Sequence, residues 1–385
     1  MFLLRLLLKN AFRHRLRTLL TMLGLVVAVG AFGLLRTIVD AWYAGAEGSS
    51  STRLIVRSAT SLTVPLPLAY AERLRAVEGV TGLSWSNWFG GVYITERNFF
   101  PQFAVDPATY LPLYPEFVLP AEARVAWQRD RKGVIVGRKL ANKFGWAVGD
   151  NIPLRGTIYG GTWNFTLRGI YDGADVGVDE NQMLMHWALI NETIRARNAG
   201  RGNLVGVFVV RINDPNNAAV VSQRIDEQFR NSLAETLTET EKAFQLGFVS
   251  MSEAILVALQ AVGWIIIVII MAVMANTMAM TARERLAEYA TLKALGFPPG
   301  FVVRLLFGES LLIALIGGVL AVAATLPAAA AFSNATGALF PVFRVSELTI
   351  ALQLVAALTV GVVAAAWPSW KMSRIDIVDG LRHVA

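Results

Sequence analysis

Residues 281–300, TARERLAEYATLKALGFPPG, form a charged stretch between two long uncharged runs, and the rest of the chain is organised around it. The run before it, residues 254–282, has no charged side chain over 29 positions. A helix needs only about 20 apolar residues to cross a bilayer. After Arg304 and Glu309, no charge follows until Arg344. The stretch is therefore predicted to be a short turn between two membrane crossings.

Helical spacing orders the charges within this stretch. Glu284 and Glu288 share one helical face, whereas Arg285 and Tyr289 share another. Gly296 and the proline pair after it are expected to stop the helix. A short helix across the mouth of a membrane bundle is a natural docking surface. Composition alone equally allows a solvated loop held on the cytoplasmic side by its positive charge.

The amino-acid composition excludes a wholly soluble protein. Of the 385 residues, 55% are hydrophobic and 16% are charged, and the mean hydropathy is +0.49. In a soluble chain the net charge of +7 would suggest a nucleic-acid partner. Here, however, residues 41–250 hold 21 Lys and Arg against 20 Asp and Glu. The basic excess belongs to the membrane flanks, and we expect no nucleic acid as a partner.

Few side chains could support catalysis or metal binding. The chain has no cysteine, and its three histidines lie far apart, so we predict no metal site. The phosphate-binding pattern G-x-x-x-x-G-K-[S/T] is absent, and we expect no cofactor on this chain. We therefore predict a non-catalytic membrane subunit. The acidic loop at residues 172–180 leaves a calcium site open, but its spacing differs from an EF-hand and a solvated loop is favoured.

The first 40 residues predict an amphipathic helix followed by a membrane span. Arg5, Lys9, Arg13 and Arg17 recur every four residues beside apolar side chains, as in a helix whose cations lie among lipid headgroups. We predict a cytoplasmic interfacial helix at residues 1–17 and a first span at 18–40. A cleaved signal peptide is disfavoured because the apolar run is too long and the small-residue site at 44–46 lies too far from it.

Residues 41–250 predict a large domain of mixed secondary structure. Short β-type runs alternate with helical runs without regular βαβ spacing, which favours α+β. The predicted fold class is therefore a membrane protein with four transmembrane α-helices and a large α+β periplasmic domain between the first and second. Strands are predicted at residues 53–56, 92–95, 133–136, 152–154, 164–170 and 204–212, and helices at 67–77, 138–144 and 218–237.

The last third of the chain returns to the membrane. Its Lys and Arg residues lie beside the predicted cytoplasmic ends of the spans, which predicts that both termini are cytoplasmic. The predicted segments are a second span at 251–280, a cytoplasmic helix at 281–300, a third span at 305–331, a periplasmic loop at 332–347, a fourth span at 348–370 and a cytoplasmic tail at 371–385.

Four stretches carry a resemblance to a known family. Residues 283–297 follow the pattern R-E-x-x-x-E-Y-A-T-L-K-A-L-G-F. The others are GVIVGRKLANKFGWAVGDNIPL at 133–154, VRINDPNNAAVVSQRIDEQFRN at 210–231 and WPSWKMSRIDIVDGLR at 367–382. Together they resemble the permease subunits of the MacB, FtsX and LolC/LolE group of ABC transporters. The resemblance spans nearly the whole chain except residues 60–119.

The resemblance implies that residues 281–300 form a coupling helix that inserts into a separate ATPase subunit. It implies two copies of that ATPase, which hold ATP and magnesium, and a second permease copy or paralogue in a dimer. The resemblance also implies that the protein lies in the bacterial inner membrane. Membrane lipid and a periplasmic adaptor or enzyme would be further partners. The residues assigned to ATPase coupling are Arg283, Glu284, Arg285, Glu288, Tyr289, Lys293, Leu295 and Gly296.

Glu309 lies one turn inside an apolar run, where an acid is costly unless it is paired or near the interface. One interpretation is a carboxylate at the level of the lipid headgroups. The other is a coupling relay in which Glu309 pairs with Arg283, Arg285 or Arg304. A push on the coupling helix would then reach the third span directly.

Two functions are compatible with this sequence. The first is mechanotransmission, in which ATP hydrolysis by the partner moves the periplasmic domain to export or extract a hydrophobic compound, peptide, lipid or lipoprotein. The alternative is a non-transporting, FtsX-like transmitter that controls a periplasmic enzyme. An intramembrane enzyme lacks a catalytic set. Most aromatic side chains of residues 60–119 are expected in a core, and any exposed ones would offer a surface to a lipid, a hydrophobic substrate or a partner.

Overall fold

A computed structural model of the chain describes residues 7, 9–175, 177–336, 340 and 342–374. It divides into a helical unit, Met1–Asp40, Glu253–Ala335 and Phe343–Ala385, and a sheet unit, Ala41–Ser252 and Thr336–Val342. Parts of four predicted segments lie outside the described residues. These are residues 1–6 and 8 of the interfacial helix, with Arg5 among them, residue 176 of the large domain, residues 337–339 and 341 of the outer loop, and residues 375–385 of the tail.

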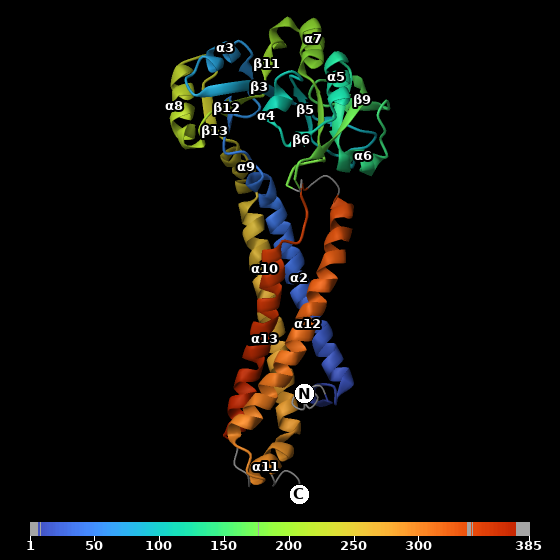
Figure 1. Cartoon of the computed structure of the whole chain (residues 1–385), viewed down its shortest axis with the longest axis vertical. Coiled ribbons are helices and arrows are strands. Elements are labelled where there is room, and N and C mark those ends of the chain that lie inside the picture. Colours follow the sequence, from blue (N-terminus) through green and yellow to red (C-terminus); the bar gives the residue numbers. More distant parts are fainter. Residues whose placement is uncertain (1–6, 8, 176, 337–339, 341, 375–385) are drawn as a thin grey trace. The chain divides into compact units, whose positions relative to one another are not determined.

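Among the described residues, four long helices are apolar enough to cross a membrane, and Figure 1 shows them. They are α2 (Arg15–Glu47), α10 (Glu253–Glu284), α12 (Pro299–Thr336) and α13 (Glu347–Ser373). Most extend beyond the predicted spans, because an uncharged run marks only the hydrocarbon crossing and a helix continues through its charged end turns. The predicted fold class, four spanning helices with a mixed domain between the first and second, is confirmed.

A short helix, α11 (Leu286–Ala294), connects α10 to α12. The predicted cytoplasmic segment therefore contains the end of α10, all of α11 and the start of α12. Arg285 separates the first two helices with a backbone that is no longer helical. Gly296 follows α11 at a φ of +91°, a conformation that glycine adopts without steric cost. Pro299 begins α12, where proline's missing N–H is no loss.

A buried amide joins three of the long helices. Gln353 of α13 donates from Nε2 to the carbonyl oxygen of Val29 at 3.0 Å and to the hydroxyl of Thr325 at 2.8 Å. Gly33 of α2 lies directly beside this amide, and a Cβ there would overlap it. Small residues let helix backbones approach closely, and polar side chains then bond across the contact. These contacts hold α2, α12 and α13 together within the apolar core of the helical unit.

The sheet unit contains an 11-stranded mixed sheet in the order β13-β1-β12-β3-β5-β10-β7-β9-β8-β4, with β6 paired to β9. The pairs β5–β10 and β7–β9 are parallel, and the other pairs are antiparallel. The strands are β1 (Arg53–Ser58), β2 (Leu66–Pro67), β3 (Val80–Trp88), β4 (Gly91–Val92), β5 (Gln102–Val105), β6 (Phe117–Val118), β7 (Gly133–Gly137), β8 (Asn151–Gly156), β9 (Thr162–Gly173), β10 (Met183–His186), β11 (Leu204–Val205), β12 (Val207–Ile212) and β13 (Thr236–Thr240). Strands β2 and β11 form a separate pair.

Helices cover the sheet, so that its central strands are buried on both faces. The helices are α3 (Tyr70–Arg75), α4 (Tyr110–Leu113), α5 (Ala121–Arg129), α6 (Arg138–Phe144), α7 (Trp187–Arg197), α8 (Ala218–Gln228) and α9 (Glu241–Ser250). Every residue of β7 is buried. Val134 and Val136 enter one core, whereas Ile135 enters the other. A continuous apolar run is typical of a strand that is covered on both faces.

Three local predictions are wrong in part. The helix predicted at residues 218–237 ends at Gln228, and Thr236–Thr240 forms β13 because β-branched residues favour a strand. The strand predicted at 204–212 divides at Gly206 into β11 and β12. The strand predicted at 92–95 stops at Val92, because Ile94 has a φ of +59° that no regular strand allows.

Arg53 links the first strand of the sheet unit to its last helix. It begins β1, which follows α2, and Glu241 begins α9, which precedes α10. Arg53 Nε donates to Glu241 Oε2 at 2.8 Å, and the guanidinium also pairs with Glu116. Only 5% of the Arg53 side chain is exposed. The two chain segments that connect to α2 and α10 are therefore fastened to each other within the sheet unit.

Candidate functional site

One face of α11 turns inward against the helical unit. Tyr289 is buried in an apolar cluster with Ala282, Val302, Leu305, Leu306 and Met372. Burial raises the pKa of the Tyr289 hydroxyl to about 12, an effect that the nearby Arg285 guanidinium opposes. Arg285, Tyr289 and Lys293 follow one another at four-residue intervals, so they share this face. Three of the residues assigned to ATPase coupling are thus used inside the chain.

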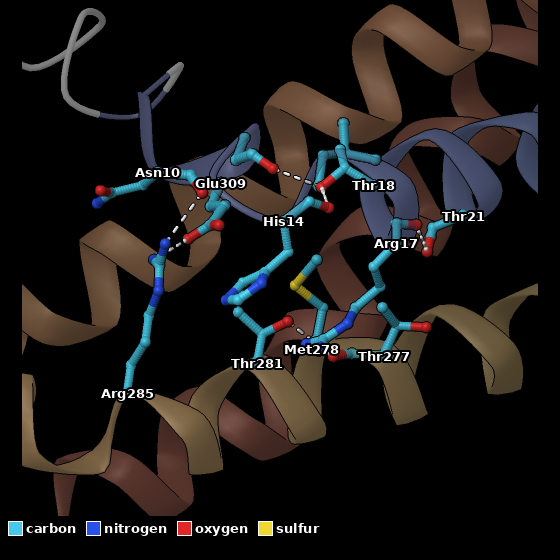
Figure 2. Close-up of a pocket in the computed structure, with 12 residues that line it drawn as sticks. Asn10, His14, Arg17, Thr18, Thr21, Thr277, Met278, Thr281, Arg285 and Glu309 are labelled. Carbon is cyan, nitrogen blue, oxygen red and sulfur yellow. Dashed lines mark hydrogen bonds and ion pairs between the residues drawn. The ribbon is translucent and has the colours of Figure 1, made fainter.

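The inward face carries a buried ion pair (Figure 2). Arg285 Nη1 donates to Glu309 Oε2 at 2.9 Å, and each side chain is 4% exposed. Arg285 Nη2 also donates to the backbone carbonyl of Asn10 at 2.9 Å. Among the three arginines considered for Glu309, the partner is Arg285. Because removal of either charge would strand the other, the pair fixes the start of α11 to α12.

A small cavity lies beside this ion pair. Its volume is about 20 Å³, and Figure 2 shows that threonine hydroxyls of α2 and α10 surround it, together with His14, Arg17, Arg285 and Glu309. A space of this size holds about one water molecule. It is too small to hold a transported compound.

The two acids on the outer part of α10 and α11 pair with basic residues at the start of the chain. Arg17 binds Glu284 in a bidentate contact, with N–O distances of 2.6 and 2.7 Å, and Arg13 pairs with Glu288. The Arg13–Glu288 pair is half exposed. Arg13 and Arg17 were expected to bind lipid headgroups, and instead they contact protein carboxylates. The shared four-residue spacing of both pairs is the sequence signal that could have indicated this contact.

Lys293 fastens the other end of α11 to α13. Its Nζ donates to the carbonyl oxygens of Met372 at 3.2 Å and Ser373 at 2.9 Å. The last carbonyls of a helix have no partner within that helix, and they carry its partial negative charge. A lysine at this position therefore caps α13. This bond connects α11 to α13, the Arg285–Glu309 pair connects the start of α11 to α12, and the Arg13–Glu288 pair connects α11 to the segment before α2.

The end of α11 and the turn after it face outward. We call residues 295–300 the α11 tip. Leu295 is 72% exposed and Phe297 is 42% exposed, and the two prolines between Phe297 and Gly300 are exposed as well. The Phe297 ring lies 4.9 Å from the ring of Phe301. The tip is thus an apolar protrusion, which is unusual for a surface that meets only water.

Arg283 and Arg304 are exposed and form no ion pair within the described part of the chain. In the sheet unit, the acidic loop makes local contacts. Asp172 accepts two hydrogen bonds from Arg138, which lowers the pKa of this carboxyl. Burial raises the pKa of Asp179. These acids therefore have different surroundings rather than one common site.

The aromatic side chains of residues 60–119 lie partly in the core and partly on the surface. Phe89, Phe100, Tyr110 and Tyr114 are buried. Trp88 and Phe99 are 39% and 50% exposed, with ring centroids 6.1 Å apart, and Ile94 is 75% exposed. The core was the expected place for most of these side chains. The exposed ones give the sheet unit an apolar surface.

Two protein families match this chain. Residues 18–228 match the MacB-like periplasmic core domain, and residues 261–377 match the FtsX-like permease C-terminal domain. The first match alone covers more than half of the chain. It includes most of α2 and most of the sheet unit, and the second includes most of α10 and all of α11, α12 and α13.

Individual relatives share low sequence identity with this chain. The chain is 23% identical to an uncharacterised ABC transporter permease of Methanocaldococcus jannaschii, over 97% of this chain and 96% of the relative. It is 28% identical to an uncharacterised ABC transporter permease protein of Mycobacterium tuberculosis over 48% of this chain, and that match spans only 20% of the relative's length.

The periplasmic region of MacB from Actinobacillus actinomycetemcomitans aligns with 52% of this chain and 94% of that structure, at 9% identity and a TM-score of 0.37. The two family matches, which together run from the first spanning helix to the last, carry the assignment. This chain belongs to the ABC transporter permeases that combine a MacB-like periplasmic core domain with an FtsX-like permease domain.

Proposed function

We propose that this chain is the non-catalytic permease subunit of an ABC transporter that converts ATP hydrolysis by a separate ATPase into movement of the sheet unit. Membership of the permease family supports the proposal. The chain has no phosphate-binding loop of the kind that ATPases use. ATP and magnesium would therefore be bound by the partner. We further propose two ATPase copies and a second permease copy or paralogue.

The ATPase would dock on the α11 tip. Leu295 and Phe297 offer exposed apolar side chains of the type that enter a pocket on a partner. Glu284 and Glu288, in contrast, are occupied by Arg17 and Arg13. Of the residues first assigned to ATPase coupling, the docking surface proposed here therefore keeps Leu295 and Gly296 and leaves out the two acids. The acids would set the position of α11 rather than contact the partner.

The observation that carries the proposal is that the two ends of α11 are bonded to two of the long helices. Arg285 reaches Glu309 of α12, and Lys293 reaches the last carbonyls of α13. Pressure on the tip would move these helices together instead of bending a loop. Within the sheet unit, the Arg53–Glu241 pair couples the segments that follow α2 and precede α10. A tilt of these helices would then be transmitted to the sheet.

The exposed Trp88, Phe99 and Ile94 support a hydrophobic cargo. We propose that the moving sheet unit exports or extracts a hydrophobic compound, peptide, lipid or lipoprotein. The α11 tip would face the cytoplasm and the sheet unit the periplasm, with the protein in the inner membrane. Because the chain has no cysteine, a single cysteine at Ser50 or at Gly300 reports its side of the membrane without a background signal. Labelling of both positions from the same side would contradict this orientation.

Photocrosslinking tests the docking surface. A photoreactive amino acid replaces Leu295 in cells that express the native ATPase, and Thr359, an exposed residue within α13, serves as the control position. We expect a crosslinked subunit at position 295 that contains a phosphate-binding loop and hydrolyses ATP, and none at position 359. Crosslinks at position 295 to lipid alone would contradict the proposal.

A further inference from the structure

A second, larger cavity opens on the helical unit between α10 and α13. Its volume is about 440 Å³, within the range of about 300–1,000 Å³ in which proteins bind small molecules. Its lining residues come mainly from α10, with one aromatic residue from α13. They are Ala275, Asn276, Ala279, Met280, Arg283 and Trp367. The inward face of α11 contributes none of them, so this cavity is distinct from the coupling contacts.

The charge at this cavity is positive and uncompensated. Arg283 is exposed and has no ion pair or hydrogen bond from its guanidinium within the described residues. Its neighbour Glu284 is held by Arg17. Lys371 places its Nζ 5.2 Å from the centroid of the Trp367 ring, which lines the cavity. Because the lining has one cation, Arg283, and no carboxylate, and Lys371 lies close by, the cavity favours an anion.

The surroundings of the cavity match the edge of a membrane. Arg374 lies 4.6 Å from the centroid of the Trp370 ring, beside the Lys371–Trp367 contact. Tryptophans with lysine or arginine gather where a spanning helix meets the lipid headgroups. On the other side of Arg283 along α10, Met280 and Val273 are about half exposed. The anion site therefore adjoins an apolar surface that a lipid tail can cover.

We propose that this cavity binds the headgroup of an anionic phospholipid. The Arg283 guanidinium would bind the phosphate, and the Asn276 amide would donate a further hydrogen bond. Lys371 would supply a second cation, and the acyl chains would lie along Val273 and Met280. A lipid is favoured over a free phosphate because the apolar helix surface continues directly from the charged end of the cavity. Arg283 is thereby assigned to lipid rather than to the ATPase.

Native mass spectrometry tests this site. The purified full-length chain is delipidated in mild detergent and titrated with phosphatidylglycerol or with phosphatidylcholine. We expect the wild type to bind phosphatidylglycerol more tightly. The Arg283→Gln/Lys371→Gln variant should lose about five-fold in affinity for each cation removed. Arg283→Lys should lose less than Arg283→Gln, and Arg304→Gln, which removes an exposed arginine outside the cavity, should bind like the wild type.

Four results would overturn the proposal. The first is equal affinity of the wild type for the two lipids. The second is unchanged phosphatidylglycerol binding by the double variant. The third is efficient disulfide crosslinking between two copies that carry Asn276→Cys, because a second copy of the chain would then cover the cavity. The fourth is competition by inorganic phosphate that is as strong as competition by the lipid at equal concentration. The apolar surface would then contribute nothing to binding.

Discussion

Replacing Glu309 with glutamine should destabilise the helical unit more than any comparable change in the exposed ion pairs. Glutamine keeps the size of the side chain and one oxygen that can accept from Arg285 at the present 2.9 Å. It removes the negative charge, however, and leaves the Arg285 guanidinium without a compensating carboxylate. The Arg285 side chain is only 4% exposed, so solvent cannot replace the lost charge. Breaking a buried pair in this way costs about 3–5 kcal/mol.

The matched control is Glu288→Gln, which makes the same chemical change in α11. Its pair with Arg13 has side-chain exposures of 49% and 56%, and such a pair contributes about 0–1 kcal/mol. A double replacement, Arg285→Met with Glu309→Leu, removes both buried charges and should recover most of the loss, because apolar residues of similar volume suit the same site.

Reversible unfolding in mixed micelles, followed by fluorescence of the 10 tryptophans, measures these differences. We expect Glu309→Gln to be the least stable variant and the double replacement to lie near the wild type. The reasoning is refuted if Glu309→Gln and Glu288→Gln differ by less than about 1 kcal/mol, the upper value for an exposed pair. It is also refuted if the double replacement is less stable than Glu309→Gln.

Two further predictions concern packing and pH. Gly33→Ala should lower the stability of the helical unit by about 1–3 kcal/mol, because its new methyl group overlaps the Gln353 amide; Gly247→Ala, with nothing within 4 Å, is the control, and equal melting temperatures would contradict the packing. Burial lowers the pKa of His186, whose Nε2 lies 2.7 Å from the Trp127 carbonyl oxygen. The unfolded chain therefore takes up a proton first as pH falls below about 6.5, and the sheet unit loses stability there. His186→Gln should weaken the dependence of the melting temperature on pH between pH 7.5 and 5. An unchanged dependence would argue against a neutral buried histidine.

The long helices could be predicted from the sequence because burying a charge in a bilayer is costly. Uncharged runs before and after α11 therefore mark apolar stretches that lie within α10, α12 and α13. The sheet was harder to predict. Residues 236 and 237 end the stretch predicted as a helix, but they belong to β13, whose β-branched residues favour a strand and whose hydrogen-bond partners are supplied by β1. Strand pairing between distant segments is not visible in a local pattern.

The sequence indicated a short helix between the second and third spans, but the orientation of α11 was not predictable. Helical spacing separated Glu284 and Glu288 from Arg285 and Tyr289. Which face turns inward depends on partners elsewhere, such as Glu309 and the basic residues before α2. Charged residues are normally assigned to the exposed face. Here a charged face is the buried one, because each cation finds an acid or a helix end.

The most direct test of the account is the amount of ATPase that co-purifies with the permease after gentle extraction from its native membrane. Leu295→Asp/Phe297→Asp changes the exposed tip, whereas Glu284→Gln/Glu288→Gln changes only the acids that Arg17 and Arg13 already bind. We predict that the tip variant loses the ATPase and that the acid variant retains it at the wild-type ratio. Loss of the ATPase from the acid variant, with normal retention by the tip variant, would show that docking uses the acidic face and would contradict the account.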